Sequence, residues 1–268
     1  MSIRKWLIRT SCTENNLNIK NEYTERAMLN LGCGTRMNSN WTNLDFSPYA
    51  HLVRYKRLAK ILRKIGLLSK ERYEKVLNID PKIILWDLRK GVPFPDESFD
   101  VIYNSHLLEH MRRNEVTVFL MECYRVLKMN GIVRVVVPDL ENIINRYIAA
   151  ISRLKDGDNS ASILHERAIH DLFDQMVRNE PAGRRRQSTL VRFLEKIVRG
   201  NASNTGELHR WMYDRYSLKG LLSGVGFKDI QQRSPNESKI DRWNTFKLDI
   251  NDDGTIYKPG SLYMEASK

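Results

Sequence analysis

The sequence predicts an α/β protein with a mostly parallel seven-stranded sheet, helices on both faces of the sheet and a helical cap insertion. Three observations lead to this fold class. Strand-like runs alternate along the chain with segments of helical periodicity, as they do in βαβ units. The runs at 27–31 and 132–137 are largely apolar, as expected of strands buried on both faces. The first run leads into Gly32-Cys33-Gly34, a glycine turn.

The first four predicted strands are short apolar runs bounded by polar or turn residues. They cover residues 27–31, 41–44, 82–85 and 99–103. Asp45 ends the second strand, Asp87 follows the third, and a proline-containing loop precedes the fourth. Only about ten residues separate Gly34 from Asp45, whereas a parallel crossover usually takes roughly a dozen or more. The first helix is therefore expected to be abbreviated.

The later elements follow from helical spacing and from stop signals. A helix is predicted over 107–128, where apolar residues recur at helical intervals until Asn130-Gly131 ends the segment. The fifth strand, 132–137, stops at Pro138. A late helix over 216–225 ends at Gly226 and leads into strands at 227–231 and 261–266.

Length and composition favour one domain with insertions. The chain has 268 residues, of which 41% are hydrophobic and 9% aromatic, enough for one sizeable core. No apolar run reaches the ~20 residues that span a bilayer, so we expect a cytoplasmic protein. The three scattered cysteines indicate neither disulfides nor a zinc knuckle. We expect an N-terminal extension at 1–26 and one domain at 27–268, with a basic helical insertion at 51–72 and a helical cap at 141–208.

The net charge of +12, from 44 Lys and Arg against 32 Asp and Glu, indicates attraction to an anionic partner. Nucleic acid, phospholipid headgroups and a phosphorylated substrate all fit this charge. The basic clusters are at 54–64 and 184–186. A helix over 52–68 combines an apolar stripe with basic faces, so it is either a lid packed on the core or a contact with an anionic membrane.

The residues that follow the first three strands suit a nucleoside ligand. In an open parallel sheet, ligands bind beyond the carboxyl ends of the strands. Gly32 and Gly34 allow close approach of a ligand, Asp45 can accept hydrogen bonds from ribose hydroxyls, and Asp87 can accept one from an adenine amino group. Met37 stands where a third glycine would complete a dinucleotide fingerprint, which disfavours NAD.

This combination resembles the class I S-adenosylmethionine (SAM)-dependent methyltransferases, in particular predicted methyltransferases of the type 11 kind. The matching segments are Leu29-Asn30-Leu31-Gly32-Cys33-Gly34, Asn43-Leu44-Asp45, Asp87-Leu88, 93–100, His106-Leu107-Leu108-Glu109-His110, 124–131, and the late elements at 213–227. The resemblance implies a Rossmann-like fold that binds SAM through Gly32, Gly34, Asp45, Asp87 and Leu88, with Ser105 near the methionine end of the cofactor.

Candidate catalytic residues follow the fourth strand. His106, Glu109 and His110 have the i, i+3, i+4 spacing of one helical face. Glu109 and His110 either cap and pack this helix or act in catalysis, while His106 is a candidate general base. No dedicated metal site is predicted, although HxxEH with the distant His209 leaves binding of a divalent ion open. The segment 209–214 either stacks on a sugar or joins cap to core.

The predicted activity is methyl transfer from SAM to a hydroxyl of a glycan or glycolipid precursor, because the resemblance is strongest to proteins associated with surface-polysaccharide genes. Two alternatives stay open. One is a nucleic-acid methyltransferase, which is less favoured because no aromatic recognition module or Asn-Pro-Pro-Tyr-like motif is present. The other is a catalytically silent SAM-binding module. The sequence does not indicate an oligomeric state.

Overall fold

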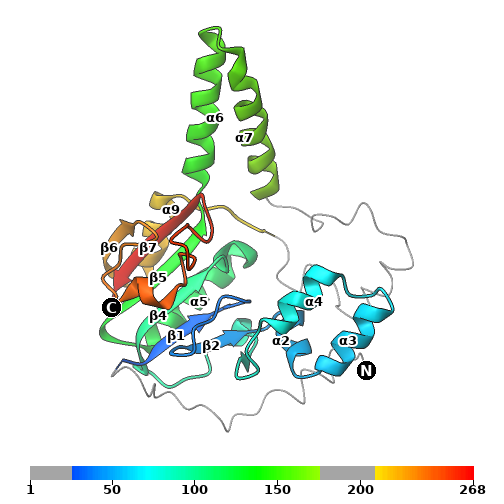
Figure 1. Ribbon diagram of the computed structural model, residues 1–268. Helices are drawn as coiled ribbons and strands as arrows, with labels where there is room; N and C mark the ends of the chain where they lie inside the picture. Colours follow the sequence, from blue (N-terminus) through cyan, green and yellow to red (C-terminus); the bar gives the residue numbers. More distant parts are fainter. Residues whose placement is uncertain (1–25, 176–208) are drawn as a thin grey trace.

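The computed structural model describes residues 26–175 and 209–268 (Figure 1). Seven strands form one sheet in the order β3-β2-β1-β4-β5-β7-β6. β1 to β5 run parallel, whereas β7 is antiparallel to both β5 and β6. The strands are β1 Met28–Leu31, β2 Thr42–Asp45, β3 Ile84–Leu85, β4 Phe99–Ser105, β5 Leu127–Pro138, β6 Lys228–Arg233 and β7 Ser261–Ser267. The predicted mostly parallel seven-stranded sheet is confirmed.

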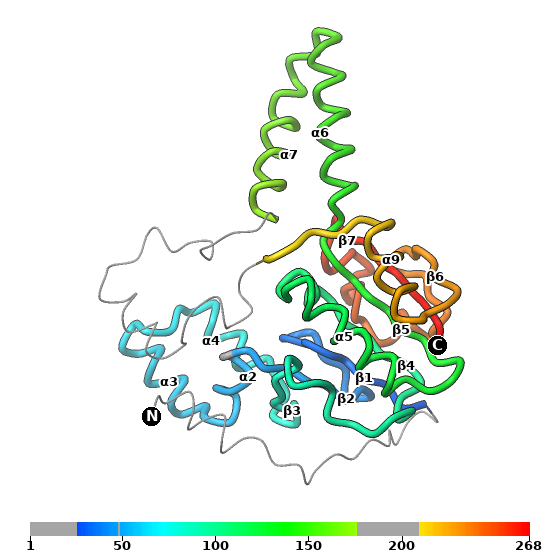
Figure 2. The backbone as a smooth tube through the Cα atoms, turned by 180° about the vertical axis from the view of Figure 1, so that it is seen from behind, coloured from blue at the N-terminus to red at the C-terminus, as the bar shows by residue number. Residues whose placement is uncertain are grey.

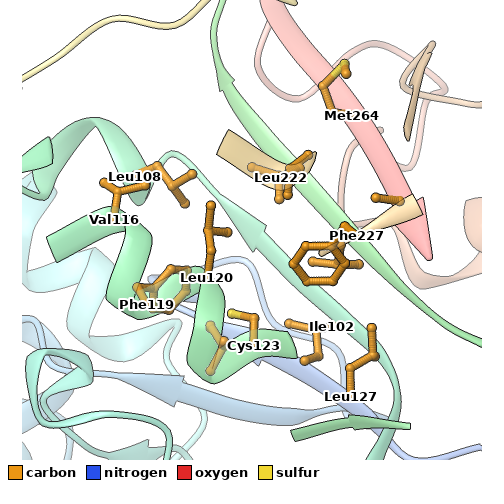
Figure 3. Close-up of a cluster of buried hydrophobic side chains, with 14 of the residues drawn as sticks. Ile102, Leu108, Val116, Phe119, Leu120, Cys123, Leu127, Leu222, Phe227 and Met264 are labelled. Atoms are coloured by element: carbon orange, nitrogen blue, oxygen red, sulfur yellow. The ribbon is translucent and has the colours of Figure 1, made fainter. Parts of the chain in front are cut away.

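One face of the sheet is covered by α5 (Arg113–Val126) and α9 (Arg215–Val225). Apolar side chains of both helices meet the strands in one buried cluster (Figure 3). Ile102 of β4 packs with Leu120 of α5, Leu222 of α9 and Met264 of β7 in this cluster. The cluster fixes the position of the helices that follow β4 and therefore the shape of the carboxyl edge of the sheet.

The opposite face is covered by a long segment between β6 and β7 that contains the short 3₁₀ helix η7 (Trp243–Phe246). Arg134 of β5 is fully buried beneath this segment and forms ion pairs with Asp249 at 2.8 Å and Glu265 at 2.7 Å. The hydroxyl of Tyr103 also donates to Asp249 over 2.6 Å. A buried guanidinium needs such partners, so these bonds hold the 234–250 segment against the sheet.

The basic insertion differs from its prediction. The single helix expected over 52–68 is wrong, because α2 (Pro48–Val53) ends before Tyr55, and α3 (Lys56–Lys64) ends before Gly66, whose φ is 75°. α4 (Lys70–Leu77) follows, capped by the Ser69 hydroxyl. The three helices pack on a small apolar cluster of their own beside the β2 and β3 edge (Figure 2).

The helix predicted over 107–128 is also shorter than expected. The chain first forms a single 3₁₀ turn, η3 (Leu108–His110), and α5 begins only at Arg113. Glu115 accepts a hydrogen bond from the amide of Arg112 over 2.9 Å, a capping-box contact that fixes the start of α5. The expected arrangement of His106, Glu109 and His110 on one α-helical face is therefore wrong. The chain also enters β5 at Leu127, before Asn130-Gly131.

The described part of the predicted cap is a helical hairpin. α6 (Leu140–Lys155) and α7 (Ser162–Gln175) lie antiparallel and project away from the sheet (Figure 1). The rest of the predicted cap, the basic cluster at 184–186, the N-terminal residues 1–25 and Cys12 lie outside the described residues. No helix in the described ranges is long and apolar enough to cross a membrane.

Candidate active site

A pocket of about 350 Å³ lies where residues following β1, β2, β3 and β4 converge. This is the carboxyl edge of the sheet, where open α/β sheets bind ligands. Its walls include six residues predicted from the sequence: Gly32, Asp45, Asp87, Leu88, His106 and His110. The structure adds residues that were not predicted individually as site residues: Phe46, Ser47, Arg89, Leu107, Met111, Arg112, Glu115 and Arg210. Of these, Arg210 belongs to the segment 209–214, for which stacking on a sugar was one interpretation.

Both the backbone conformation at position 32 and the surrounding side chains require a glycine there. Its φ is 68°, and a Cβ at this position would lie 2.9 Å from Cδ1 of Leu107. Gly34 also has a positive φ, 54°, but nothing lies within 4 Å of the position that its Cβ would take. The first helix, expected to be abbreviated, is missing altogether from the described residues between β1 and β2: the chain turns directly after Gly34 and enters β2.

Asp45 is only 6% exposed and connects the two loops beside it. Its Oδ2 accepts a hydrogen bond from the amide of Gly34 over 2.8 Å, and its Oδ1 accepts one from the amide of Ser47 over 2.5 Å. A carboxylate has about four acceptor positions, so these two bonds leave capacity for a ligand in the pocket.

Asp87 faces the pocket together with Arg89. The guanidinium of Arg89 binds both carboxylate oxygens, with distances of 2.8 and 2.7 Å. Burial alone would raise the pKa of Asp87, but the hydrogen bonds and charge of Arg89 lower it below its usual value. Asp87 is therefore an ionised acceptor, and a ligand at this position would share it with Arg89.

His106 follows β4 in a left-handed conformation, with a φ of 51°. Its Nε2 lies 2.8 Å from Oγ of Ser261, whose proton is donated to the carbonyl of Lys258 over 2.9 Å. Nε2 of His106 is therefore the donor to Ser261. Its Nδ1 lies 3.2 Å from Oε1 of Glu109, an ion-pair distance without the alignment of a hydrogen bond.

Glu109, His110 and His209 come together although η3 is not an α-helix. One ligand atom from each residue lies within 4.8 Å of the others. The carboxylate of Glu109 is fully buried, and burial alone would raise its pKa, but His106 and His110 lower it below the usual value. The amide of Arg210 donates to the carbonyl of Glu109 over 2.6 Å, which brings His209 to η3.

Four predicted positions, Gly34, Ser105, Glu109 and His209, are not among the described residues that line the pocket. Ser105 ends β4, one residue before His106.

Cys33 and Cys123 are free and buried, and burial raises the pKa of both thiols, so they are not activated nucleophiles.

Lys258 was missed by sequence reasoning. Burial lowers its pKa to about 8, while the charges of Glu109 and Asp249 oppose this shift. A single lysine in a loop before β7 has no distinguishing pattern, because its burial depends on the 234–250 segment packing across the sheet.

Comparisons with known proteins give one family match and several distant structural likenesses. Residues 29–135 match the family model described as a methyltransferase domain. No curated protein matches the chain in sequence. Among solved structures, a SAM-dependent methyltransferase from Archaeoglobus fulgidus is 14% identical, with 90% of this chain and 85% of that chain covered and a TM-score of 0.38. The YcgJ protein from Bacillus subtilis is 12% identical, with 99% and 97% covered and a TM-score of 0.39.

The family match lies on the elements that build the pocket. It runs from β1 into β5 and includes the glycine turn, Asp45, Asp87 and the segment from His106 to His110. The match over residues 29–135 therefore supports a class I methyltransferase domain that uses S-adenosylmethionine.

Proposed function

We propose that this domain transfers the methyl group of SAM to a hydroxyl of a glycan or glycolipid precursor. The proposal rests on which residues line the pocket on the two sides of Gly32. The strand order β3-β2-β1-β4 sets Asp87 and Asp45 on one side of Gly32 and His106 on the other. Two carboxylates suit a nucleoside, whereas an imidazole suits an acceptor that must lose a proton.

The residues on the carboxylate side fit SAM. Gly32 lines the pocket, and its lack of a side chain lets the backbone approach a ligand. Asp45 would accept hydrogen bonds from the ribose hydroxyls, and Asp87 would accept one from the adenine amino group beside the amide of Leu88. Bound SAM supplies an electrophilic methyl group on a sulfonium sulfur.

His106 is the proposed general base. Methyl transfer to the acceptor oxygen would release the hydroxyl proton, and Nε2 of His106 would take it in the tautomer whose own proton lies on Nδ1, towards Glu109. The acceptor hydroxyl would replace Ser261 at this nitrogen, an exchange that the 2.8 Å contact permits by a small rotation of the serine side chain. Glu109, 3.2 Å from Nδ1, would stabilise the imidazolium that forms.

The acceptor side also offers groups suited to a sugar. Arg210 lines the pocket, and the next residue, Trp211, is 40% exposed. The guanidinium of Arg113 lies over the Trp211 ring, 4.7 Å from its centroid, and holds the ring in place. Sugar rings stack on such exposed aromatic faces, while their hydroxyls bind charged groups nearby.

A lipid-linked acceptor is supported by α3. Ala59 packs inward, but Leu58, Ile61 and Ile65 are 37%, 54% and 61% exposed. These three apolar residues lie among exposed basic residues of the same helix: Lys56, Arg57, Lys60, Arg63 and Lys64. Exposed apolar side chains surrounded by cations are the composition of an interfacial helix, so we propose that α3 contacts an anionic membrane that presents the acceptor.

Transfer of an isotope-labelled methyl group from SAM to oligosaccharides, glycolipids and RNA tests this function. We expect label in a glycan or glycolipid, at an oxygen, and less label in the same acceptor with Asp45→Ala when SAM is subsaturating. Label in RNA alone would establish the nucleic-acid alternative. Binding of SAM without transfer to any acceptor in such panels would favour a silent module.

A further inference from the structure

We propose that Glu109, His110 and His209 form a binding site for a divalent transition metal such as Zn²⁺. Their ligand atoms lie within 4.8 Å of one another, a spacing that one ion between them can bridge after small side-chain rotations. Two imidazole nitrogens and one carboxylate oxygen are a ligand set typical of zinc sites that keep an open coordination position.

The carboxylate of Glu109 is an independent indication of a cation. The residue is 0% exposed, and neither of its oxygens has a hydrogen-bond partner among the described residues. Nδ1 of His106 lies 3.2 Å from Oε1, which is an ion-pair distance. A buried carboxylate is normally hydrogen-bonded, paired in good geometry or bound to a metal. A cation at this position would satisfy the unbonded oxygens.

The surroundings of His209 match those of a metal ligand. Its Nδ1 lies 3.3 Å from the backbone carbonyl of Gln175, to which it donates, so Nε2 keeps its lone pair for an ion. Metal-binding histidines commonly donate their second nitrogen to a carbonyl in this way. The rings of His110 and His209 have centroids 4.8 Å apart at an interplanar angle of 75°, which brings both imidazoles to one side of Glu109.

The position of the site indicates what the ion would bind. His110 lines the pocket, next to His106, on the side that we assign to the acceptor. An ion held there would offer its open coordination position to an oxygen atom of the acceptor. Metal binding itself does not depend on the proposed acceptor, because it rests only on the three side chains.

Metal titration of the full chain tests the proposal separately from catalysis. The protein is freed of metal with EDTA, dialysed, and titrated with Zn²⁺ by calorimetry and with Co²⁺ by visible absorption. We expect one equivalent of each ion to bind, and a visible Co²⁺ band of the kind that nitrogen and oxygen ligands at low coordination number produce. Thermal unfolding should shift upward with Zn²⁺.

The variants His110→Ala, His209→Ala and Glu109→Gln should each weaken binding at least ~10-fold and reduce the Zn²⁺-induced thermal shift. His170→Ala, an exposed histidine on α7 outside the cluster, is the matched control and should bind as the wild type does. If Glu109→Gln fails to fold, the two histidine variants still show whether the cluster binds the metal. Absence of stoichiometric binding by the wild type, or full binding by both histidine variants, would overturn the proposal and leave His106 and Lys258 as the counter-charges of Glu109.

Discussion

The amide of Gly34 donates a hydrogen bond to Oδ2 of Asp45 over 2.8 Å, which ties the turn after β1 to the end of β2. The amide of Ser47 binds the other oxygen of the same carboxylate. Asp45 thus shapes the pocket while its remaining acceptor positions face the space where we place the ribose of SAM.

Asp45→Ala is expected to weaken SAM binding by about 1 to 3 kcal/mol, which is roughly 5-fold to 150-fold in the dissociation constant. The loss arises because a charge-assisted acceptor disappears and the Gly34 turn loses its anchor. Calorimetric titration with SAM measures it. Asp241→Ala, which removes an exposed carboxylate elsewhere, is the control. Unchanged affinity in Asp45→Ala would rule out its assignment to the ribose.

Gly32→Ala is expected to lower the free energy of unfolding more than Gly34→Ala does. Both substitutions meet a positive φ, which costs roughly 1 to 2 kcal/mol for a residue with a Cβ. Only Gly32 also brings the new Cβ to 2.9 Å from Leu107. Urea unfolding measures the free energy of unfolding of both variants. Adding Leu107→Ala to Gly32→Ala should reduce the part of the loss that comes from the clash with Leu107. If Gly32→Ala and Gly34→Ala lower the free energy of unfolding equally, the contact with Leu107 does not contribute.

His106→Ala is expected to reduce turnover by ~10² to 10⁴-fold while leaving the SAM dissociation constant nearly unchanged. The base acts on the acceptor, whereas the cofactor contacts lie on the other side of Gly32. Single-turnover methyl transfer and calorimetry measure the two quantities. Ser261→Ala is the control, because it removes the partner of Nε2 but keeps the imidazole. Undiminished turnover in His106→Ala would leave His106 a packing role only.

Changing Lys56, Lys60, Arg63 and Lys64 to Gln is expected to abolish salt-sensitive cosedimentation with anionic vesicles. Each basic residue near such a surface contributes ~1 kcal/mol. Ile61→Ser with Ile65→Ser should weaken binding without changing the charge, since both side chains are exposed. Gln at Lys70 and Lys75 of α4 is the matched control. If the wild type binds neither anionic nor neutral vesicles, α3 is a lid and not a membrane contact.

The sheet could be predicted from the sequence because each strand has a local signature. Apolar runs such as Met28–Leu31 are buried throughout, and the turns that end them carry glycine, proline or aspartate. The convergence of Asp45, Asp87 and His106 on one pocket also follows from local order, since parallel strands bring their carboxyl ends to one edge.

The predicted helix boundaries were wrong where a cap or a tight turn ends or delays a helix within a stretch of helical periodicity. The contact between Glu115 and Arg112 starts α5 late, and Gly66 ends α3 early. Neither position interrupts the apolar spacing that predicts a helix. The burial of Lys258 could not be predicted either, because it depends on how the neighbouring 234–250 segment packs, and Asp249 of that segment is bound by Arg134, which is distant in the chain.

Calorimetric titration of the purified chain with SAM and with NAD tests the central claim most directly. We expect SAM to bind one site with micromolar affinity, to be displaced by its demethylated product, and NAD not to bind, because Met37 replaces the third glycine of a dinucleotide turn. Binding of NAD at this site, or failure of SAM to bind a folded protein, would contradict the account.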